Sequence, residues 1–136
     1  MCSSDLAYGK KCPTYAEFMA LAYGVTEETD RGSDPGTTQL DAARTSKWGV
    51  IQATGNLRVW GRDVIADGTG SGAWRDIAEG RGEIYTYNDE LRAGFFGGYW
   101  TNGAQAGSRS SSWWDSVASS DFSISARGVC DHLILD

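Results

Sequence analysis

The spacing of apolar residues predicts one helix near the start of the chain, in the segment CPTYAEFMALAYGV. Its apolar side chains recur at intervals of three and four residues and therefore share one side of a helix: Tyr15, Phe18, Met19 and Ala22. Thr14 and Glu17 have the spacing of a capping box at the helix start, and Gly24 can end the helix. The single apolar stripe indicates a helix that packs against the rest of the protein, and we assign it no chemistry.

Three later segments have the pattern of strands. KWGVIQATGNLRVWGRDVI predicts a hairpin with strands at about residues 48–52 and 57–60, joined by a Thr-Gly-Asn turn whose glycine and asparagine tolerate positive φ. LRAGFFGGYW is apolar and strand-like, with glycines that allow close backbone approach. ISARGVCDHLILD alternates and then becomes continuously apolar, as expected of a central strand.

Polar and glycine-rich segments separate these elements. TEETDRGSDPGTTQLDAARTS predicts a loop with a short helical turn near residues 40–43, and ADGTGSGAWRDIAEGRGEIYTYN predicts irregular chain. One helix, a few strands and long loops indicate a loop-rich α+β fold. We find no internal repeat and no interior domain boundary.

Composition and charge narrow the class of protein. The 136 residues suffice for one domain with a modest core. Hydrophobic residues make up 40% and charged residues 22%, with 18 glycines and two prolines, which is typical of a globular but loop-rich chain. The net charge of −6 disfavours nucleic-acid phosphates and anionic membranes as partners. No apolar run has the length of a transmembrane helix, so we expect no membrane insertion.

The residues that usually carry metal or redox chemistry are few. Cys2, Cys12 and Cys130 are an odd number of cysteines, and MCSSDLAYGKK lacks the apolar centre of a signal peptide, which together favour free thiols. A zinc site is not expected, because the chain has one histidine and no C-x-x-C pair. The Pro-containing motifs through which calcium-dependent lectins bind sugars do not occur around Pro13 or Pro35.

Catalytic patterns are weak as well. Asp131 and His132 are adjacent on a predicted strand, so their side chains point to opposite faces and cannot work as an acid–base pair. No two carboxylates have the spacing of a glycosidase dyad. DVIADGTGSGAW matches a dinucleotide-binding fingerprint loosely, but Gly72 and the following EGRG interrupt the helix that such a motif needs. We therefore predict a glycine loop there and no active site.

The segment GGYWTNGAQAGSRSSSWWDSVASSDF, residues 97–122, combines tryptophans with serine and glycine. A Ser/Gly-rich run is typical of a flexible linker, yet large indole rings are costly to leave in water. With its flanks, the segment carries Gly-Gly-x-Trp, then Gly-Ser-Arg, then Trp, and finally Ala-Arg-Gly-Val-Cys-Asp-His-Leu-Ile-Leu. This order resembles the C-terminal variable region of the phage major tropism determinant family, receptor-binding tail proteins that a retroelement diversifies.

The resemblance extends toward the start of the chain. CPTYAEFMALAYGVTE, TSKWGVIQATGNLRVWGRD and GAWRDIAEGRG are similar to the same family's C-type-lectin-like domain. The resemblance implies such a domain over residues 11–136, with a small antiparallel sheet, one or two helices and a variable region at about residues 92–136. Family members carry β-rich domains before this one, so we expect residues 1–10 to be a truncated leader or a segment foreign to the family.

The resemblance also divides the loop residues into two classes. It implies a framework that pins the long loops to the domain body: Trp100, Arg109, Trp113 and Arg127. Buried indoles and guanidinium hydrogen bonds to loop carbonyls can order a segment that has little regular structure. It implies a second set that is displayed and binds the ligand: Tyr99, Thr101, Asn102, Gly103, Gln105, Ser112, Trp114, Asp115, Ser119, Asp121 and Ser123.

The resemblance provides a check on the displayed set. In such systems variation enters at adenines, typically in AAC template codons, which can become Tyr, Thr, Asn, Gly, Ser or Asp. Most of the set complies, whereas Trp114 and Gln105 do not and are either fixed or encoded by other template codons.

The implied function is host recognition by a phage tail-fibre tip. We expect a homotrimeric virion protein, synthesised in the host cytoplasm, that binds a bacterial surface protein or glycan without enzyme activity, cofactor or metal. One alternative is an enzyme similar to the formylglycine-generating enzymes, which share the scaffold but use a pair of cysteines; here Cys130 is far along the chain from Cys2 and Cys12. The other is a structural virion or cell-surface protein that uses the fold for assembly alone.

Overall fold

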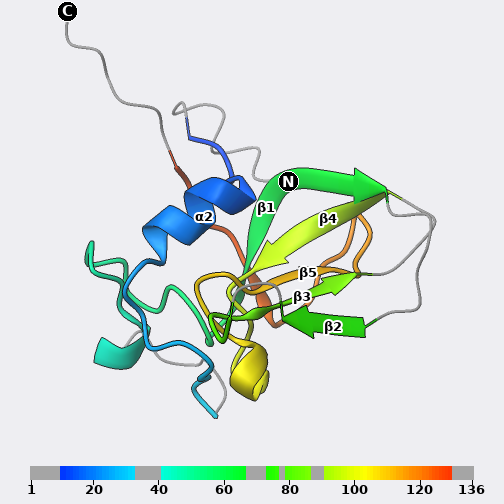
Figure 1. Cartoon of the computed structure of the whole chain (residues 1–136). Helices are drawn as coiled ribbons and strands as arrows, with labels where there is room; N and C mark the ends of the chain where they lie inside the picture. Colours follow the sequence, from blue (N-terminus) through cyan, green and yellow to red (C-terminus); the bar gives the residue numbers. More distant parts are fainter. Residues whose placement is uncertain (1–9, 33–40, 67–72, 77–78, 87–90, 130–136) are drawn as a thin grey trace, which may run out of the picture.

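The computed structural model describes residues 10–32, 41–66, 73–76, 79–86 and 91–129. One short α-helix, α2 (Tyr15–Leu21), lies against a six-stranded sheet (Figure 1). The loops carry two 3-10 helices, η1 (Ala42–Arg44) and η2 (Gly103–Gln105). The strands, in chain order, are β1 (Arg58–Ala66), β2 (Ala73–Asp76), β3 (Glu83–Thr86), β4 (Leu91–Phe96), β5 (Ser111–Trp113) and β6 (Ile124–Ser125).

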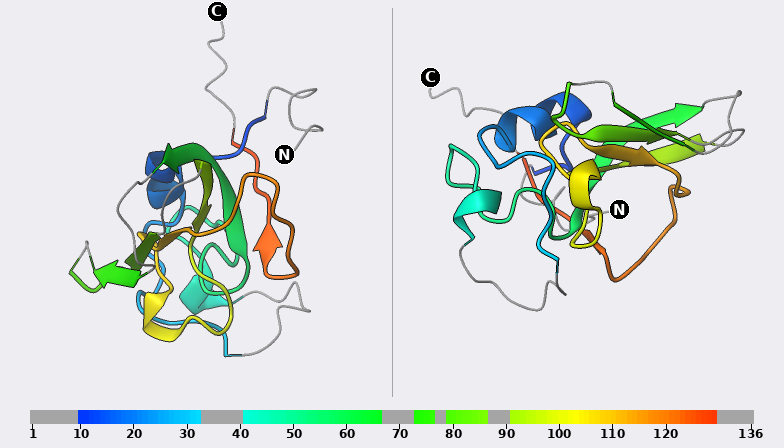
Figure 2. Two further views of the ribbon diagram at one scale, coloured as in Figure 1. Left: turned by 90° about the vertical axis from the view of Figure 1, so that its right-hand side faces the viewer. Right: turned by 60° about the horizontal axis from the view of Figure 1, so that its bottom comes forward.

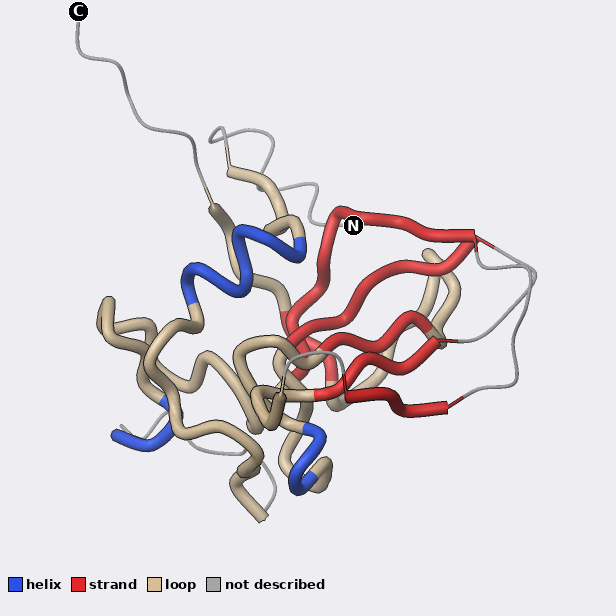
Figure 3. The backbone as a smooth tube through the Cα atoms, in the orientation of Figure 1, coloured by secondary structure: helices blue, strands red, loops and turns tan. Residues whose placement is uncertain are grey.

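The sheet has the order β2-β3-β5-β4-β1-β6. The pairs β1/β4, β4/β5 and β2/β3 are antiparallel, as predicted for the whole sheet, whereas β3/β5 and β1/β6 are parallel. These two parallel pairs arise because β5 and β6 return to the sheet through long loops rather than tight turns, as the backbone trace in Figure 3 shows. The α+β fold class predicted from the sequence is confirmed.

The helix begins as the sequence predicts. Thr14 is its N-cap, with its hydroxyl accepting a hydrogen bond from the Glu17 amide at 3.2 Å. The Glu17 carboxylate accepts in return from the Thr14 amide at 2.7 Å, which completes the capping box. The α-helix ends at Leu21, before Gly24, which has a φ of 89°.

The core lies between α2 and one face of the sheet. Phe18 and Ala22 are fully buried against Phe96, and the Phe18 and Phe96 ring centroids are 5.4 Å apart. Trp113 of β5 packs on the same Phe96, with ring centroids 5.9 Å apart. A β-carbon on Gly94 would lie 2.8 Å from the Trp113 ring, so the glycine in this strand lets the indole pack close to the backbone of β4.

The prediction of a hairpin at residues 48–60 is wrong for its first strand. Residues 48–52 form turns, in which the Ser46 amide donates to the Val50 carbonyl at 3.0 Å. Gly49 and Gln52 have φ values of 81° and 50°, which an extended strand does not allow. The second predicted strand exists as β1, but it continues to Ala66 and pairs with β4.

Other differences come from short strands. β2 and β3 form a hairpin within the segment predicted to be irregular, and β5 lies inside the Ser/Gly-rich segment. The helical turn expected near residues 40–43 is present as η1. Of the predicted C-terminal strand, β6 is described, and residues 130–136 lie outside the described part.

Candidate binding site

A row of side chains crosses the sheet on the face away from α2. Residues directly opposite each other on paired strands point to the same face. The register pairs join into one row across five strands: Trp74↔Tyr85, Tyr85↔Ser112, Ser112↔Phe95 and Phe95↔Trp60. Four of these side chains are aromatic and Ser112 is small, so the row leaves space at its centre.

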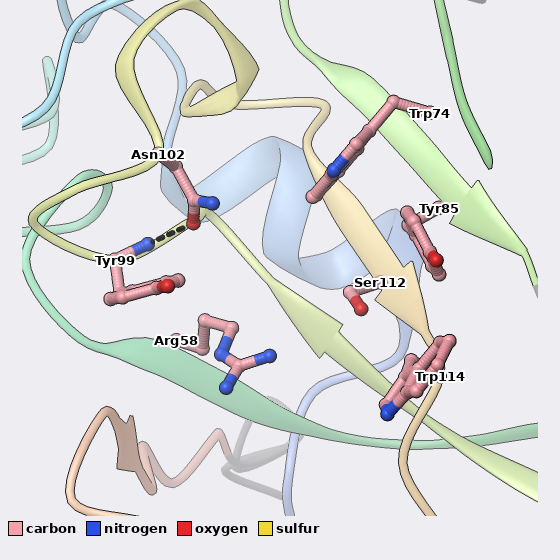
Figure 4. Close-up of a pocket in the computed structure, with 7 residues that line it drawn as sticks. All are labelled: Arg58, Trp74, Tyr85, Tyr99, Asn102, Ser112 and Trp114. Carbon is pink, nitrogen blue, oxygen red and sulfur yellow. Dashed lines mark hydrogen bonds between the residues drawn. The ribbon is translucent and has the colours of Figure 1, made fainter. Parts of the chain in front are cut away.

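An open pocket of about 270 Å³ lies at this position (Figure 4). Its lining combines the sheet row with loop residues: Arg58, Trp74, Tyr85, Tyr99, Asn102, Ser112 and Trp114. The Tyr85 ring contacts both neighbouring indoles edge to face, with centroid distances of 5.2 Å to Trp74 and 5.6 Å to Trp114. Aromatic rings therefore form the side of the pocket over β2, β3 and the end of β5.

The opposite side comes from the loop after β4. Gly97 and Gly98 have φ values of 89° and 73°, which turn the chain sharply out of the strand. A β-carbon on Gly98 would lie 2.8 Å from the Ala106 backbone, so the loop also folds back on itself closely there. The Asn102 side-chain oxygen accepts from the Tyr99 amide at 2.7 Å, the bond drawn in Figure 4. This bond holds both residues at the pocket.

Arg58 connects the loops at the base of the site. Its guanidinium lies 5.1 Å from the Tyr99 ring centroid and 5.4 Å from that of Phe95, within range of cation–π attraction. Nη2 donates to the Ser123 hydroxyl at 2.8 Å, and Nη1 lies 3.5 Å from an Asp115 carboxylate oxygen. One side chain of β1 thus contacts three separate loop residues.

Asp121 orders the loop that reaches Ser123. Its carboxylate accepts from the Ser123 amide at 2.7 Å and from the Ser123 hydroxyl at 2.5 Å. These bonds, and more weakly the charge of Arg58, lower the pKa of Asp121. Asp121 is therefore coupled to Arg58 through Ser123.

The residues predicted to be displayed fall into three places. Four line the pocket: Tyr99, Asn102, Ser112 and Trp114. Three connect to or through Arg58: Asp115, Asp121 and Ser123. The rest lie on the η2 loop or on the loop between β5 and β6: Thr101, Gly103, Gln105 and Ser119.

Their exposure is uneven. Trp114 is 45% exposed, whereas Ser112 and Ser123 are only 5% and 2% exposed. These two serines are therefore buried: Ser112 lies on the floor of the pocket, and Ser123 is connected to it through Arg58. Gly103 lies on the exposed η2 loop, where its amide donates to the Asp30 carboxylate.

The residues predicted as framework differ in their contacts. Trp113 is 4% exposed, and its indole N–H donates to the Ser111 hydroxyl at 3.1 Å. The Arg127 guanidinium donates to the Ile51 and Gln52 carbonyls at 2.6 and 2.9 Å, and burial lowers the pKa of Arg127.

The other two predicted framework residues are less enclosed. Trp100 is half-buried between the rings of Tyr99 and Phe122. Arg109 is exposed, and its backbone makes its loop contacts: its amide donates to the Arg81 carbonyl, and its own carbonyl accepts from the Tyr15 hydroxyl.

Sequence reasoning missed three lining residues: Arg58, Trp74 and Tyr85. They lie before the expected variable region. The signal available was the β-favouring run Glu-Ile-Tyr-Thr at residues 83–86 and the lone tryptophan before it. The glycines around both segments favoured an irregular interpretation instead.

Several residues considered in the sequence analysis lie outside the described residues: Cys2, Pro35, Gly72, Cys130, Asp131 and His132. Cys12 is half-buried just before the helix cap. Within the ranges that the structure describes, no three His, Cys, Asp or Glu residues are grouped so that they could hold a metal ion. Among those same ranges, no helix has the length and apolar character to cross a membrane.

Comparison with known proteins gives matches over almost the whole chain. The chain is 39% identical, over 138 aligned residues, to the tail fiber receptor-binding protein of Bordetella phage BPP-1, an alignment that covers 95% of this chain. Solved structures of the Major Tropism Determinant M1 and U1 variants match 97% of the chain with TM-scores of 0.74 and 0.75, each at 39% identity. The P3c variant matches 93% of the chain at 41% identity, with a TM-score of 0.71. No family model matches the chain.

These matches identify the fold of the chain and the proteins to which it is related. The chain spans 35% of the curated relative's length and 36% of the M1 variant's chain, about a third of each. At about 40% identity over an aligned fold, the sheet, the helix and the loops described above are those of a C-type-lectin-like fold. The resemblance inferred from the sequence is confirmed: nearly the whole chain is related, in sequence and in fold, to about a third of a phage major tropism determinant.

Proposed function

We propose that this chain is the receptor-recognition domain of a phage tail-fibre protein and that it binds through the pocket at Ser112. The observation that carries the proposal is the convergence of Tyr99, Asn102, Ser112 and Trp114 on one open pocket. The resemblance implies that all four are displayed residues, and in the fold they lie around one pocket. The relatives' names, receptor-binding protein and tropism determinant, support the same role.

The chemistry of the pocket suits binding rather than catalysis. Its lining is rich in Trp, Tyr and Arg, the residue types that dominate binding hot spots. Beyond the pocket, Phe122 is 80% exposed and its ring lies on Trp100, with centroids 5.6 Å apart, which extends the aromatic surface. The lining set contains a hydroxyl at Ser112 but no histidine or carboxylate to activate it. We therefore propose a non-enzymatic role that needs neither metal nor cofactor.

The partner in this proposal is a receptor on the bacterial surface, and the protein is a component of the virion. Residues 11–136 form the lectin-like domain, with the variable region at about residues 92–136. We expect a homotrimer, because three linked sites raise avidity by roughly 10²–10⁴ without new contacts. Sedimentation of the complete fibre protein as a monomer alone would count against the tail-fibre assignment.

Cell binding tests the role of the pocket. The fluorescently labelled chain is incubated with a panel of bacterial strains in the presence and absence of a metal chelator, and bound label is measured by flow cytometry. We expect a binding strain to lose most of its signal with Trp114→Ala and to be unaffected by the chelator.

Trp48→Ala is the matched control, because Trp48 is 66% exposed and does not line the pocket. Equal loss of binding with Trp48→Ala and Trp114→Ala would contradict the assignment of the site.

A further inference from the structure

Arg58 has an unusual position relative to the displayed residues. It lies on β1, before the expected variable region, yet its guanidinium contacts Tyr99, Asp115 and Ser123, which all belong to the displayed set. In Figure 4 its side chain extends from β1 between Tyr99 and Trp114. Changes at the displayed positions would therefore change the partners of Arg58, which lies outside the expected variable region.

Asp115 offsets the positive charge that Arg58 brings to the pocket. Arg58 is the charged residue among the seven that line the pocket, and Asp115 is its ion-pair partner at 3.5 Å. Their side chains are 18% and 22% exposed, so water screens the pair less than it would on an open surface. With Asp115 present, its carboxylate offsets the guanidinium charge at the base of the pocket, while the Asp121 carboxylate is exposed and reaches Arg58 only through Ser123. With an uncharged residue at position 115, the positive charge of Arg58 would face the ligand.

We propose that Arg58 is a fixed specificity residue and that position 115 sets the charge of the ligand group the pocket accepts. The protein as it stands, with Asp115, selects an uncharged, ring-shaped group. A variant without a carboxylate at position 115 selects a ring-shaped group that carries a carboxylate. This inference rests on the proposed binding function and goes further by naming the ligand chemistry and the residue that determines it.

The ring preference comes from the aromatic side of the pocket. Trp74 and Tyr85 are joined edge to face on the β2/β3 hairpin, and Trp114 closes the same side. Flat groups stack well on such rings. A carboxylate on a stacked ring could form a charge-assisted bond with Arg58, but it would meet like-charge repulsion from Asp115 in the present chain.

Two small probes of nearly the same shape test the proposal. Benzoate and benzamide share the flat ring and differ in charge, and their binding is followed by titrating the indole N–H signals of Trp74 and Trp114 in ¹H–¹⁵N spectra. In the unmodified chain, benzamide should bind at least as tightly as benzoate. In the Asp115→Asn variant, benzoate should bind roughly tenfold more tightly than benzamide, a difference of about 1.4 kcal/mol in binding free energy. Adding Arg58→Gln to Asp115→Asn should remove that preference.

Two control variants distinguish loss of the Arg58–Asp115 ion pair from a change in net charge and from a loss of folding. Asp41→Asn removes one negative charge elsewhere and keeps a good cap for η1, so it should leave the probe preference unchanged. Asp115→Ser provides a second variant should Asp115→Asn lose its dispersed spectrum.

Three results would overturn the proposal: the same probe preference with and without the Asp115 carboxylate, a benzoate preference that survives Arg58→Gln, or no indole shift with either probe. If cells are still bound through Trp114, such a result removes this inference alone and leaves the proposed function standing.

Discussion

Trp113 and Trp114 are neighbours in sequence with different environments. Trp113 points to the helix side of the sheet, where it is 4% exposed and packs on Phe96. Trp114 follows directly, points to the other face as alternation requires, and is 45% exposed at the pocket. Trp113 therefore belongs to the core and Trp114 to the pocket. A shift of one residue in the register of β5 would exchange these two positions.

At the same scale, Arg127 and Arg109 provide a matched pair for stability. Arg127→Ala removes a half-buried guanidinium and leaves the Ile51 and Gln52 carbonyls without their donor. Hydrogen bonds from charged groups are worth about 1.5–3 kcal/mol, so we expect a loss of that size in the free energy of unfolding. Arg109→Ala should change it by no more than about 0.5 kcal/mol, because the side chain is exposed and its backbone contacts remain. Urea denaturation of both variants checks this; equal losses would show that Arg127 has no special role in the framework.

Among the elements, those defined by local signals were predictable. The capping box at Thr14 and the apolar stripe of α2 depend on residues within one helical turn or two, and both are present. β4 is predicted from the largely apolar, strand-like segment LRAGFFGGYW and is present at Leu91–Phe96. β5 is not predicted, because three residues show no periodicity, and its pairing with β3 and β4 joins segments far apart in sequence. The failed strand at residues 48–52 had a strand-like composition, but turns at Gly49 and Gln52 override it.

The start of α2 carries a pH dependence. The hydrogen bond from the Thr14 amide, and then the charge of Arg62, lower the pKa of Glu17, so folding favours its carboxylate form. Its stabilisation is complete above the ordinary Glu value of about 4.3 and is lost as the pH falls through the lower folded value.

Glu17→Gln tests this dependence while keeping the acceptor for Thr14. The variant should melt at a lower temperature than the unmodified chain near neutral pH, and the difference should disappear as the pH falls through the lowered pKa of Glu17. A melting difference that stays constant from pH 7 to acid would show that the Glu17 charge does not contribute.

For the whole molecule, long loops take the place of regular structure. Backbone bonds tie them together across the chain, such as those from the Gly32 amide to the Trp100 carbonyl and from the Gly55 amide to the Gly97 carbonyl, both 2.9 Å. On the sheet face opposite α2, the loop between β5 and β6 lies away from the helix in both views of Figure 2. The sequence could suggest the loop half of the site through resemblance. The part of the site on the sheet is formed by Arg58, Trp74 and Tyr85. It depends on the register between strands, which the sequence alone does not reveal.

The central claim is that separate residues hold the fold and bind the receptor, and one paired measurement on Trp113→Ala, Trp114→Ala and Tyr99→Ala tests it most directly. Each variant is assayed for its free energy of unfolding and for binding to the same bacterial strain. Trp113→Ala should lose about 3–5 kcal/mol of stability, as expected for a buried indole. Trp114→Ala and Tyr99→Ala should lose no more than about 1 kcal/mol and yet lose most of the binding. If these two variants are as destabilised as Trp113→Ala, or bind like the unmodified chain, the division between framework and display residues is wrong.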